Sequence, residues 1–370
     1  MTGIIKTDQI QGAGSSTVTI PSGTALNVTT VSGTPTFSGA STFSGDVTLP
    51  SINGGQIGGR RNIIINGAMQ VAQRGTSSTS TGFQTCDRIQ FLTNNTDNFA
   101  FTVSQSSTAP DGFSTSQKLD CTTAESSLDA DELARFLYKV EGQDIQHFNY
   151  GSSASQEVTV SFYVRSNVTG VYTVEFRLNA AGTSTITKQY TISSANTWER
   201  KILNLPKNTV TSVDNDNSNG IEISFCVAAG SNFTTGSLGT SWATTATSSR
   251  YAGQAANIMS STDNEWYITG IQMEVGSQAT SFEHRTFGEE LTLCRRYYQR
   301  YGYPFTSFRN STTYTWVDAT IWFLCLPYDA DDVVGSHALP VEMRATPTAT
   351  MTDAYIRLQN NGQNYNSGNT

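Results

Sequence analysis

Charged residues are scarce in this chain, and the balance between them is acidic. Asp, Glu, Lys and Arg make up 14% of the 370 residues, and the net charge is -8. An average globular protein has about 25% charged residues. Binding to phosphate backbones depends on clustered Lys and Arg, whereas the bases here form only isolated pairs such as Arg60-Arg61 and Arg295-Arg296. Nucleic acid is therefore not expected as a partner.

Long apolar runs are missing as well. No window approaches the ~18 consecutive apolar residues that a membrane-spanning helix needs. The first residues, 1–6, also lack the apolar region of a secretion signal. We therefore expect a protein that is made in a cytoplasm and does not insert into a membrane.

Cysteine and histidine are few and scattered. The 5 cysteines include no Cys-x-x-Cys pair, and there are only 3 histidines. Disulfide scaffolds, zinc sites and catalytic sites built on several imidazoles all need more of these residues at closer spacing. The sequence thus predicts free thiols, no bound metal and no cofactor.

Small and uncharged polar residues are abundant, in contrast to the charged residues, cysteine and histidine. The chain has 31 glycines and an abundance of Ser, Thr and Asn, and its aromatic content is 10%. Many short strands separated by polar turns produce this composition. We therefore predict an all-β protein, with more than one domain over 370 residues.

Residues 1–59 predict a stalk. They contain 3 charged residues, Lys6, Asp8 and Asp46, among short β-branched patches, and Thr-Phe-Ser-Gly occurs at 36–39 and again at 42–45. Such patches are too small to be buried within one chain. Several copies wound together would cover them, whereas the alternative is a disordered Gly/Ser-rich tail. A glycine-rich hinge at 54–61 would join the stalk to the next domain.

Residues 60–284 alternate as half-buried strands do. Val158, Val160, Phe162 and Val164 would face one side, and after a turn the phase returns in 172–178, so an antiparallel hairpin is expected. In 265–275 the alternation places Tyr267, Ile271, Met273 and Val275 on one face and Trp266 with Ile268 on the other. Many strands at this spacing indicate a two-sheet β-sandwich, or jelly roll.

Two smaller units follow the predicted sandwich. In 285–302, Thr286 and Glu289 form a capping box, and Phe287, Leu291, Cys294 and Tyr298 fall on one face, so a short connecting helix is expected. In 303–370, the apolar run 321–326 predicts a small C-terminal β domain.

Several blocks resemble fibre proteins of tailed bacteriophages, especially marine and cyanobacterial ones. They are 5–10 with 17–23, the run 62–75 (NIIINGAMQVAQRG), the block 266–276 (WYITGIQMEVG) with 282–285, 288–291 and 294–298, and the run 339–348. The resemblance implies a virion component, usually homotrimeric, whose jelly-roll domain is similar to carbohydrate-binding modules. Trp266 takes the place of a last-strand Trp in such modules. The binding residues of this family lie in variable loops, so none carries over.

Aromatic side chains in polar loops are the candidates for a glycan site, because sugars offer hydroxyl groups and weakly apolar ring faces. Trp242 and Tyr251 lie among Thr, Ser and Gly, and are either exposed platforms or aromatics folded over the sandwich edge. Trp316, beside Asp318, is the third candidate. Trp198 and Trp266 lie in strand-like runs and are expected in the core.

The sequence favours a non-enzymatic fibre protein in the virion. It would bind host surface polysaccharide as a homotrimer, and 1–59 would attach it to other phage tail or capsid proteins after assembly in the host bacterial cytoplasm. One alternative is a purely structural decoration, head fibre or collar protein. Another is a glycan-cleaving tailspike, for which Glu141 with Asp144, or Asp129 with Asp131, would be the carboxylates.

Overall fold

The computed structural model describes most of the region after residue 59. The described residues are 60–95, 98–179, 184–244, 246–299, 324–327, 333–336, 341–345, 357–360 and 363–366. The expected stalk at 1–59 lies outside them, as does most of the expected C-terminal domain at 303–370. Within the latter, two short antiparallel hairpins are described: β13 (Leu324–Pro327) with β14 (Val333–Ser336), and β15 (Arg357–Asn360) with β16 (Gln363–Asn366).

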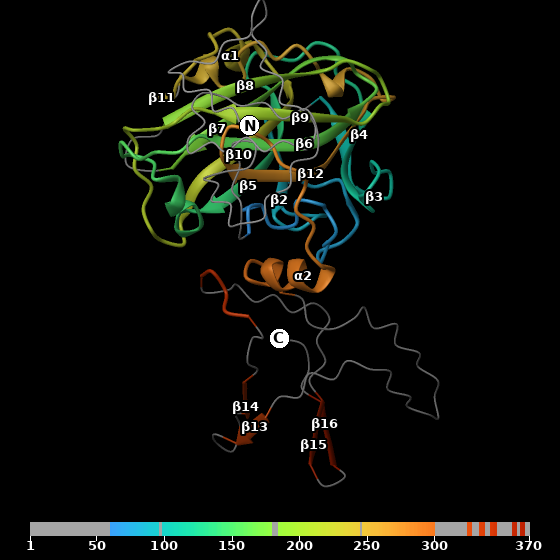
Figure 1. Ribbon diagram of the computed structural model, residues 1–370. Coiled ribbons are helices and arrows are strands. Elements are labelled where there is room, and N and C mark those ends of the chain that lie inside the picture. The colour runs from blue at the N-terminus through green and yellow to red at the C-terminus, as the bar shows by residue number, and fades with distance from the viewer. Residues whose placement is uncertain are drawn as a thin grey trace, which may run out of the picture. The chain divides into compact units, whose positions relative to one another are not determined.

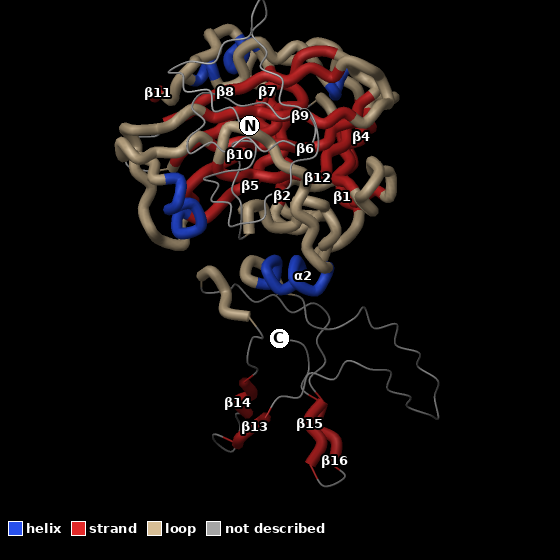
Figure 2. Tube along the Cα trace, in the orientation of Figure 1, coloured by secondary structure: helices blue, strands red, loops and turns tan. Residues whose placement is uncertain are grey.

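The main body consists of two antiparallel sheets packed face to face (Figures 1 and 2). The first sheet has, in spatial order, β1 (Ser77–Ser78), β3 (Ala100–Ser106), β4 (Ser116–Thr123), β12 (Glu265–Val275), β6 (Val158–Ser166) and β9 (Glu199–Leu205). The second sheet has β11 (Ala243–Thr244), β8 (Ser184–Ile192), β7 (Gly170–Leu178), β10 (Asn219–Ala229), β5 (Leu133–Glu141) and β2 (Ile89–Asn94).

Alternating apolar residues from both sheets fill the space between them. The Trp266 ring of the first sheet stacks on Phe136 of the second, with centroids 5.3 Å apart. Phe162 likewise meets Phe225 edge to face at 5.1 Å. All four side chains are at most 1% exposed, as expected for residues on the inner faces of a sandwich. The predicted all-β jelly roll is confirmed, and so is the core position of Trp266.

The expected hairpin between 158–165 and 172–178 is wrong. Both strands form, but β6 pairs with β12 and β9 in the first sheet, whereas β7 pairs with β8 and β10 in the second. The connecting turn crosses from one sheet to the other, and the Ser166 hydroxyl anchors its start by donating to Glu265 O at 2.6 Å. Period-2 alternation identifies a half-buried strand but not its partner, because either sheet buries the same face.

The predicted faces of β12 are also wrong after its middle. Trp266, Ile268, Ile271 and Met273 all belong to the core, so the inward phase shifts by one residue between Ile268 and Ile271. The pairing of β12 with β6 shifts register over the same interval. A bulge inserts one extra residue and so reverses the faces of everything after it. Gly270, with φ at +63°, lies at that point.

The connecting helix forms, but it is shorter than expected and packs differently. α2 spans Phe287–Arg295 and begins with the predicted capping box of Thr286 and Glu289. Its buried residues are Glu290 and Cys294, while Phe287 is 56% exposed. Polar contacts explain why Glu290 is on the buried face of α2. Its carboxylate accepts a hydrogen bond from the Asn66 amide at 2.7 Å and pairs with Arg285 at 3.2 Å. A buried ion pair therefore selects the face that packs.

The remaining helices in the described part of the chain are short. They are η1 (Gly142–Phe148), α1 (Ser231–Thr234), η2 (Thr247–Ser249) and η3 (Ile258–Ser260). The longest of them is η1, a 3-10 helix of 7 residues. Figure 1 shows α1 and α2 at opposite ends of the body. Among the described residues, no helix has the length and apolar character to cross a membrane.

Candidate functional site

The outer face of the first sheet carries a surface cluster of aromatic rings that begins at the β12 bulge. At Gly270, a Cβ atom would lie 2.7 Å from the Phe113 ring and 2.9 Å from the Tyr163 ring. Both distances are shorter than real Cβ contacts, so only glycine allows these two rings to lie directly on the strand. The bulge thus creates the space for an aromatic surface.

Four rings meet above this glycine. The Phe113 ring lies at the centre, with centroids 5.2 Å from Tyr163, 5.0 Å from Phe282 and 5.1 Å from His284. The rings are tilted or edge to face, as aromatic pairs prefer. Phe113, Tyr163 and Phe282 are half-buried, and His284 is exposed. Large apolar side chains therefore stay in contact with solvent here.

A second aromatic pair continues the cluster along the same sheet. The Trp198 ring lies edge to face on Tyr267, with centroids 6.1 Å apart. Tyr267 pairs with Arg165 across β12 and β6, and Tyr163 is on the same face of β6 as Arg165. Neighbours on one sheet face are within reach of aromatic side chains. We call the six residues Phe113, Tyr163, Trp198, Tyr267, Phe282 and His284 the aromatic band.

Trp198 is thus half-buried at the surface rather than in the core, contrary to expectation. It immediately precedes β9, an edge strand of the first sheet, so its ring lies on the outer face and not between the sheets. A strand-like sequence run does not show on which side of its sheet a particular ring will lie.

Charged and hydroxyl groups border the band. Lys118 Nζ pairs with Glu265 Oε1 at 2.6 Å, and the Tyr267 hydroxyl donates to Glu265 Oε2 at 2.7 Å. The Arg165 guanidinium lies over the Tyr267 ring, 5.0 Å from its centroid, so this 5%-exposed ring supports the band and is not itself a free stacking face. Arg200 donates to Ser161 Oγ at 3.4 Å. Aromatic faces next to such donors and acceptors are what sugar recognition requires, because a pyranose ring has an apolar face and a rim of hydroxyl groups.

The carboxylate of Glu265 is held in its charged form. Burial acts to raise its pKa, but the hydrogen bonds from Lys118 and Tyr267 outweigh burial and leave the pKa below its ordinary value. For Lys118, burial acts to lower the pKa, and the bond to Glu265 raises it overall. Each charge therefore stabilises the other, and the edge of the band is ionised at neutral pH.

The outer face of the second sheet is covered by the segment 230–257. Arg250 binds Glu175 of β7 with Nε at 3.0 Å from Oε1 and Nη2 at 2.8 Å from Oε2. Gln254 accepts from the Thr173 amide at 2.7 Å. Burial acts to lower the pKa of Arg250, but the bonds to Glu175 raise it above its ordinary value. A buried, two-point ion pair of this kind fastens the segment to the sheet.

The prediction that Tyr251 is an exposed aromatic platform is therefore wrong. Its side chain is 0% exposed and packs with Leu133, Cys226 and Phe233. Its hydroxyl shares a 2.6 Å hydrogen bond with Ser224 of β10. The polar sequence around Tyr251 belongs to the outer surface of the covering segment, whereas the ring itself points to the sheet.

Trp242 is not an exposed platform. It is folded over the edge of the sandwich, which was the other possibility for this residue. It is half-buried against the core. Its Nε1 donates to Pro206 O at 2.8 Å, and its ring lies edge to face on Tyr150 at 5.7 Å. Trp316 lies outside the described residues. The structure thus brings neither Trp242 nor Tyr251 into the aromatic band.

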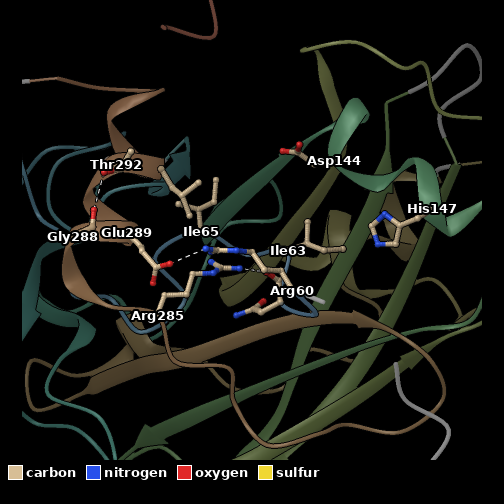
Figure 3. Close-up of a pocket in the computed structure, with 11 residues that line it drawn as sticks. Arg60, Ile63, Ile65, Asp144, His147, Arg285, Gly288, Glu289 and Thr292 are labelled. Atoms are coloured by element: carbon tan, nitrogen blue, oxygen red, sulfur yellow. Dashed lines mark hydrogen bonds and ion pairs between the residues drawn. The ribbon is translucent and has the colours of Figure 1, made fainter. Parts of the chain in front are cut away.

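A wide hollow of about 570 Å³ lies between η1, α2 and the segment 60–65 (Figure 3). Asp144 and His147 of η1 line one side, and Glu289 of α2 lines another, where it pairs with Arg60 at 2.8 Å. Burial raises the pKa of Asp144 and lowers that of His147. Of the described residues that line this hollow, none is Phe, Tyr or Trp, so a sugar ring would find no stacking surface.

A second hollow, of about 340 Å³, contains aromatic rings that are already covered. The guanidinium of Arg88 lies 3.3 Å from the Tyr297 ring centroid, and that of Arg74 lies 3.7 Å from Tyr298. These cations occupy the ring faces that a ligand would use.

The carboxylate of Glu141, which also lines the second hollow, is fully engaged. Arg296 binds it at two points, at 2.9 and 2.8 Å. Burial acts to raise the pKa of Glu141, but the bonds from Arg296 keep it below its ordinary value. A general acid needs a raised pKa, so Glu141 does not suit that role beside Asp144.

The comparisons with known proteins find similarity in solved structures alone. No protein-family model matches the chain, and no curated protein does. Among solved structures, a putative sugar-binding protein from Bacteroides thetaiotaomicron is 10% identical over 58% of this chain and 100% of its own, with a TM-score of 0.33. The family 11 carbohydrate-binding module of a Clostridium thermocellum cellulase is 10% identical over 57% and 98%, with a TM-score of 0.29.

The enzymatically active domain of tailspike protein 4 from bacteriophage CBA120 is also similar. It is 13% identical over 58% of this chain, with a TM-score of 0.32, and the match spans 21% of the tailspike chain. These likenesses describe a β-sandwich similar to carbohydrate-binding modules, and at such TM-scores they carry no argument about function.

The sequence predictions missed the aromatic band because its members come from separate segments. Phe113 lies in a loop before β4, Trp198 precedes β9, and Phe282 and His284 lie between β12 and α2. Two signals were visible: a glycine in the middle of an apolar strand, and the alternation of Phe282 with His284 in a polar segment. Neither signal alone shows that the segments meet.

Proposed function

We propose that this chain is a non-enzymatic receptor-binding protein of a phage virion and attaches to host surface glycans through the aromatic band. One observation carries the glycan part: the half-buried rings of Phe113, Tyr163, Phe282 and Trp198, bordered by charged groups, lie on the outer face of the first sheet, whereas the covering segment occupies the same face of the second. The virion part is supported by the sequence blocks that resemble fibre proteins.

Weak single sites suffice for this function if the protein is trimeric, as the resemblance implies. Three copies of a shallow site that engage one polysaccharide together raise the overall affinity by ~10²–10⁴ without new contacts. The segment 1–59 would hold the copies together and attach them to other virion proteins. No covalent chemistry is part of this function.

The test compares two tryptophans in the full-length protein. Trp198→Ala removes a ring of the band, whereas Trp242→Ala removes one whose Nε1 is bonded to Pro206 O at the edge of the sandwich. We expect Trp198→Ala to weaken binding to the host polysaccharide about tenfold, since an aromatic contact of ~1.5 kcal/mol is lost. Trp242→Ala should bind like the wild type. Titration calorimetry with polysaccharide fragments measures both, and circular dichroism confirms folding.

Other outcomes identify the alternatives. Equal binding by the wild type and Trp198→Ala would remove the band from the proposal. Absence of binding to any host polysaccharide would favour a decoration or collar protein. Release of reducing ends from the polysaccharide would identify a depolymerase. If three copies act together, binding to a densely immobilised polysaccharide should exceed binding to the free fragment by at least ~100-fold.

A further inference from the structure

Bases from four separate segments of the chain meet at the second hollow, the one of about 340 Å³. Its lining contains four bases and two acids: Arg74, Arg88, Lys139, Arg344, Asp87 and Glu141. The chain as a whole has a net charge of -8, so this local excess of positive charge is contrary to its composition. Because the four bases are far apart in the sequence, only the fold brings them together.

The two acids of this hollow are engaged by other groups. Asp87 accepts from the Gln73 amide at 3.0 Å and from Gln73 Nε2 at 2.5 Å. Its ion pair with Arg74 is 3.8 Å long, which exceeds hydrogen-bond distance, and burial keeps the pKa of Arg74 below its ordinary value. Glu141 is bound at two points by Arg296, which does not line the hollow. The bases of the hollow therefore retain an excess of positive charge.

Arg88 is the most deeply buried of the four bases. It is 6% exposed, and it forms no ion pair with any residue that the structure describes. Its Nη2 donates to Lys139 O, its guanidinium lies over the Tyr297 ring, and its Nε is buried without a hydrogen-bond partner. A buried cation without an anionic partner is costly, and a ring face offsets only part of that cost. The hollow therefore favours an anion.

Lys139 and Arg344 are the exposed bases at the rim of this hollow. The Lys139 side chain is 42% exposed, and its Nζ lies 3.5 Å from Glu222 Oε1. Arg344 is exposed as well and is held in place by Asn217: Arg344 Nη1 donates to Asn217 O at 3.0 Å, and Asn217 Nδ2 donates to Arg344 O at 2.6 Å. The exposed Ser218 adds a hydroxyl group to the lining. A ligand thus reaches the rim from solvent without displacing core residues.

We propose that the second hollow binds an acidic sugar and that its four bases hold the anionic group, a carboxylate or a phosphate. The guanidinium groups of Arg88 and Arg74 lie over the rings of Tyr297 and Tyr298, 3.3 and 3.7 Å from the centroids, and are thus oriented before a ligand arrives. Pockets of ~300–1,000 Å³ take whole small molecules, so the hollow has room for a sugar ring beside its anionic group. No residue of the aromatic band lines it, and the inference rests on the proposed function only in that the ligand is a sugar.

The test titrates the full-length protein with three sugars by calorimetry at low ionic strength. Glucuronate has a carboxylate, glucose 6-phosphate has a phosphate, and glucose has neither. At least one acidic sugar should bind at one site per chain, at least ~tenfold more tightly than glucose, because hydrogen bonds to charged groups are the stronger ones. The acidic sugar that binds more tightly identifies the anionic group.

Variants of the rim bases assign the binding to this hollow. The double variant Lys139→Gln/Arg344→Gln should weaken binding of the acidic sugar about tenfold, since two exposed charge contacts are lost. Both side chains are exposed, so the fold should be kept, and circular dichroism checks it. Lys207→Gln is the matched control, because Lys207 is an exposed base that does not line the hollow. It should bind like the wild type.

Three results would overturn the proposal. The first is binding of both acidic sugars no tighter than that of glucose. The second is a loss in Lys207→Gln as large as in the double variant, which would indicate a general effect of charge. The third is inorganic phosphate binding as tightly as glucose 6-phosphate while glucuronate does not bind, because the hollow would then take a free ion and not a sugar. The proposed function is decided separately, by the polysaccharide and Trp198→Ala.

Discussion

The outer face of the second sheet is covered, whereas that of the first sheet is open. The strands of both sheets nevertheless show the same alternation of inward and outward residues. On the second sheet, the outer residues Thr173, Glu175 and Ser224 each bind the segment 230–257. On the first sheet, the outer residues near the bulge meet aromatic rings that remain in contact with solvent. The comparison teaches that alternation determines which residues point outward, whereas a distant segment determines whether that face is available to a ligand.

Detaching the cover should have the largest effect on stability. Arg250→Ala leaves the Glu175 carboxylate, whose side chain is 2% exposed, without its partner. A buried charge that loses its partner costs about 3–5 kcal/mol, and we expect about 3 kcal/mol here from urea unfolding. Arg165→Ala on the open face should cost less than about 1 kcal/mol, because exposed polar contacts contribute little. Equal losses of unfolding free energy in the two variants would mean that the Arg250–Glu175 pair stabilises the protein no more than an exposed contact does.

Filling the glycine under the band should have an intermediate effect. Gly270→Ala places a Cβ atom against Phe113 and Tyr163 at a positive φ, so we expect a loss of about 2 kcal/mol from strain and overpacking. Gly112→Ala is the control: its φ is also positive, but nothing lies within 4 Å of the new atom. It should cost about 1 kcal/mol and leave polysaccharide binding unchanged. Equal losses in the two variants would show that the rings move aside freely.

Removing the charge at the edge of the band should have the smallest effect, and it depends on pH. The pKa of Glu265 is lowered in the folded protein, so its contribution is present above its unfolded pKa of about 4.3 and is lost as pH falls through the folded value. Glu265→Gln should therefore be less stable than the wild type by less than about 1 kcal/mol at pH 7. Urea unfolding should show this difference shrink as the pH falls below the unfolded value and vanish once the pH is below the lowered folded pKa. A difference that grows on acidification would contradict the assignment.

Local patterns in the sequence predict the elements of this fold well. Alternation locates β6, β7 and β12, and the Thr286–Glu289 capping box locates the start of α2. Local patterns fail for features that depend on residues distant in the sequence. The partner of β6, the phase shift at Gly270 and the exposed position of Phe287 follow from the bulge and from buried polar pairs, which no local window contains.

The candidate site was hardly predictable from the sequence, for the same reason. A polar neighbourhood suggested that Tyr251 is exposed, but its segment packs back on the sheet and buries the ring. A strand-like neighbourhood suggested that Trp198 is buried, but the edge position of β9 leaves it at the surface.

The position of β12 has a consequence for how the protein is made. This strand is the last of the sandwich in sequence, yet it lies between β4 and β6 in the first sheet. A nascent chain that emerges from the ribosome therefore exposes the unpaired edges of both strands until residue 275 is available. Open edges can pair with other chains, and neighbouring nascent copies are the nearest ones. Productive synthesis thus depends on the last strand arriving before such a neighbour does.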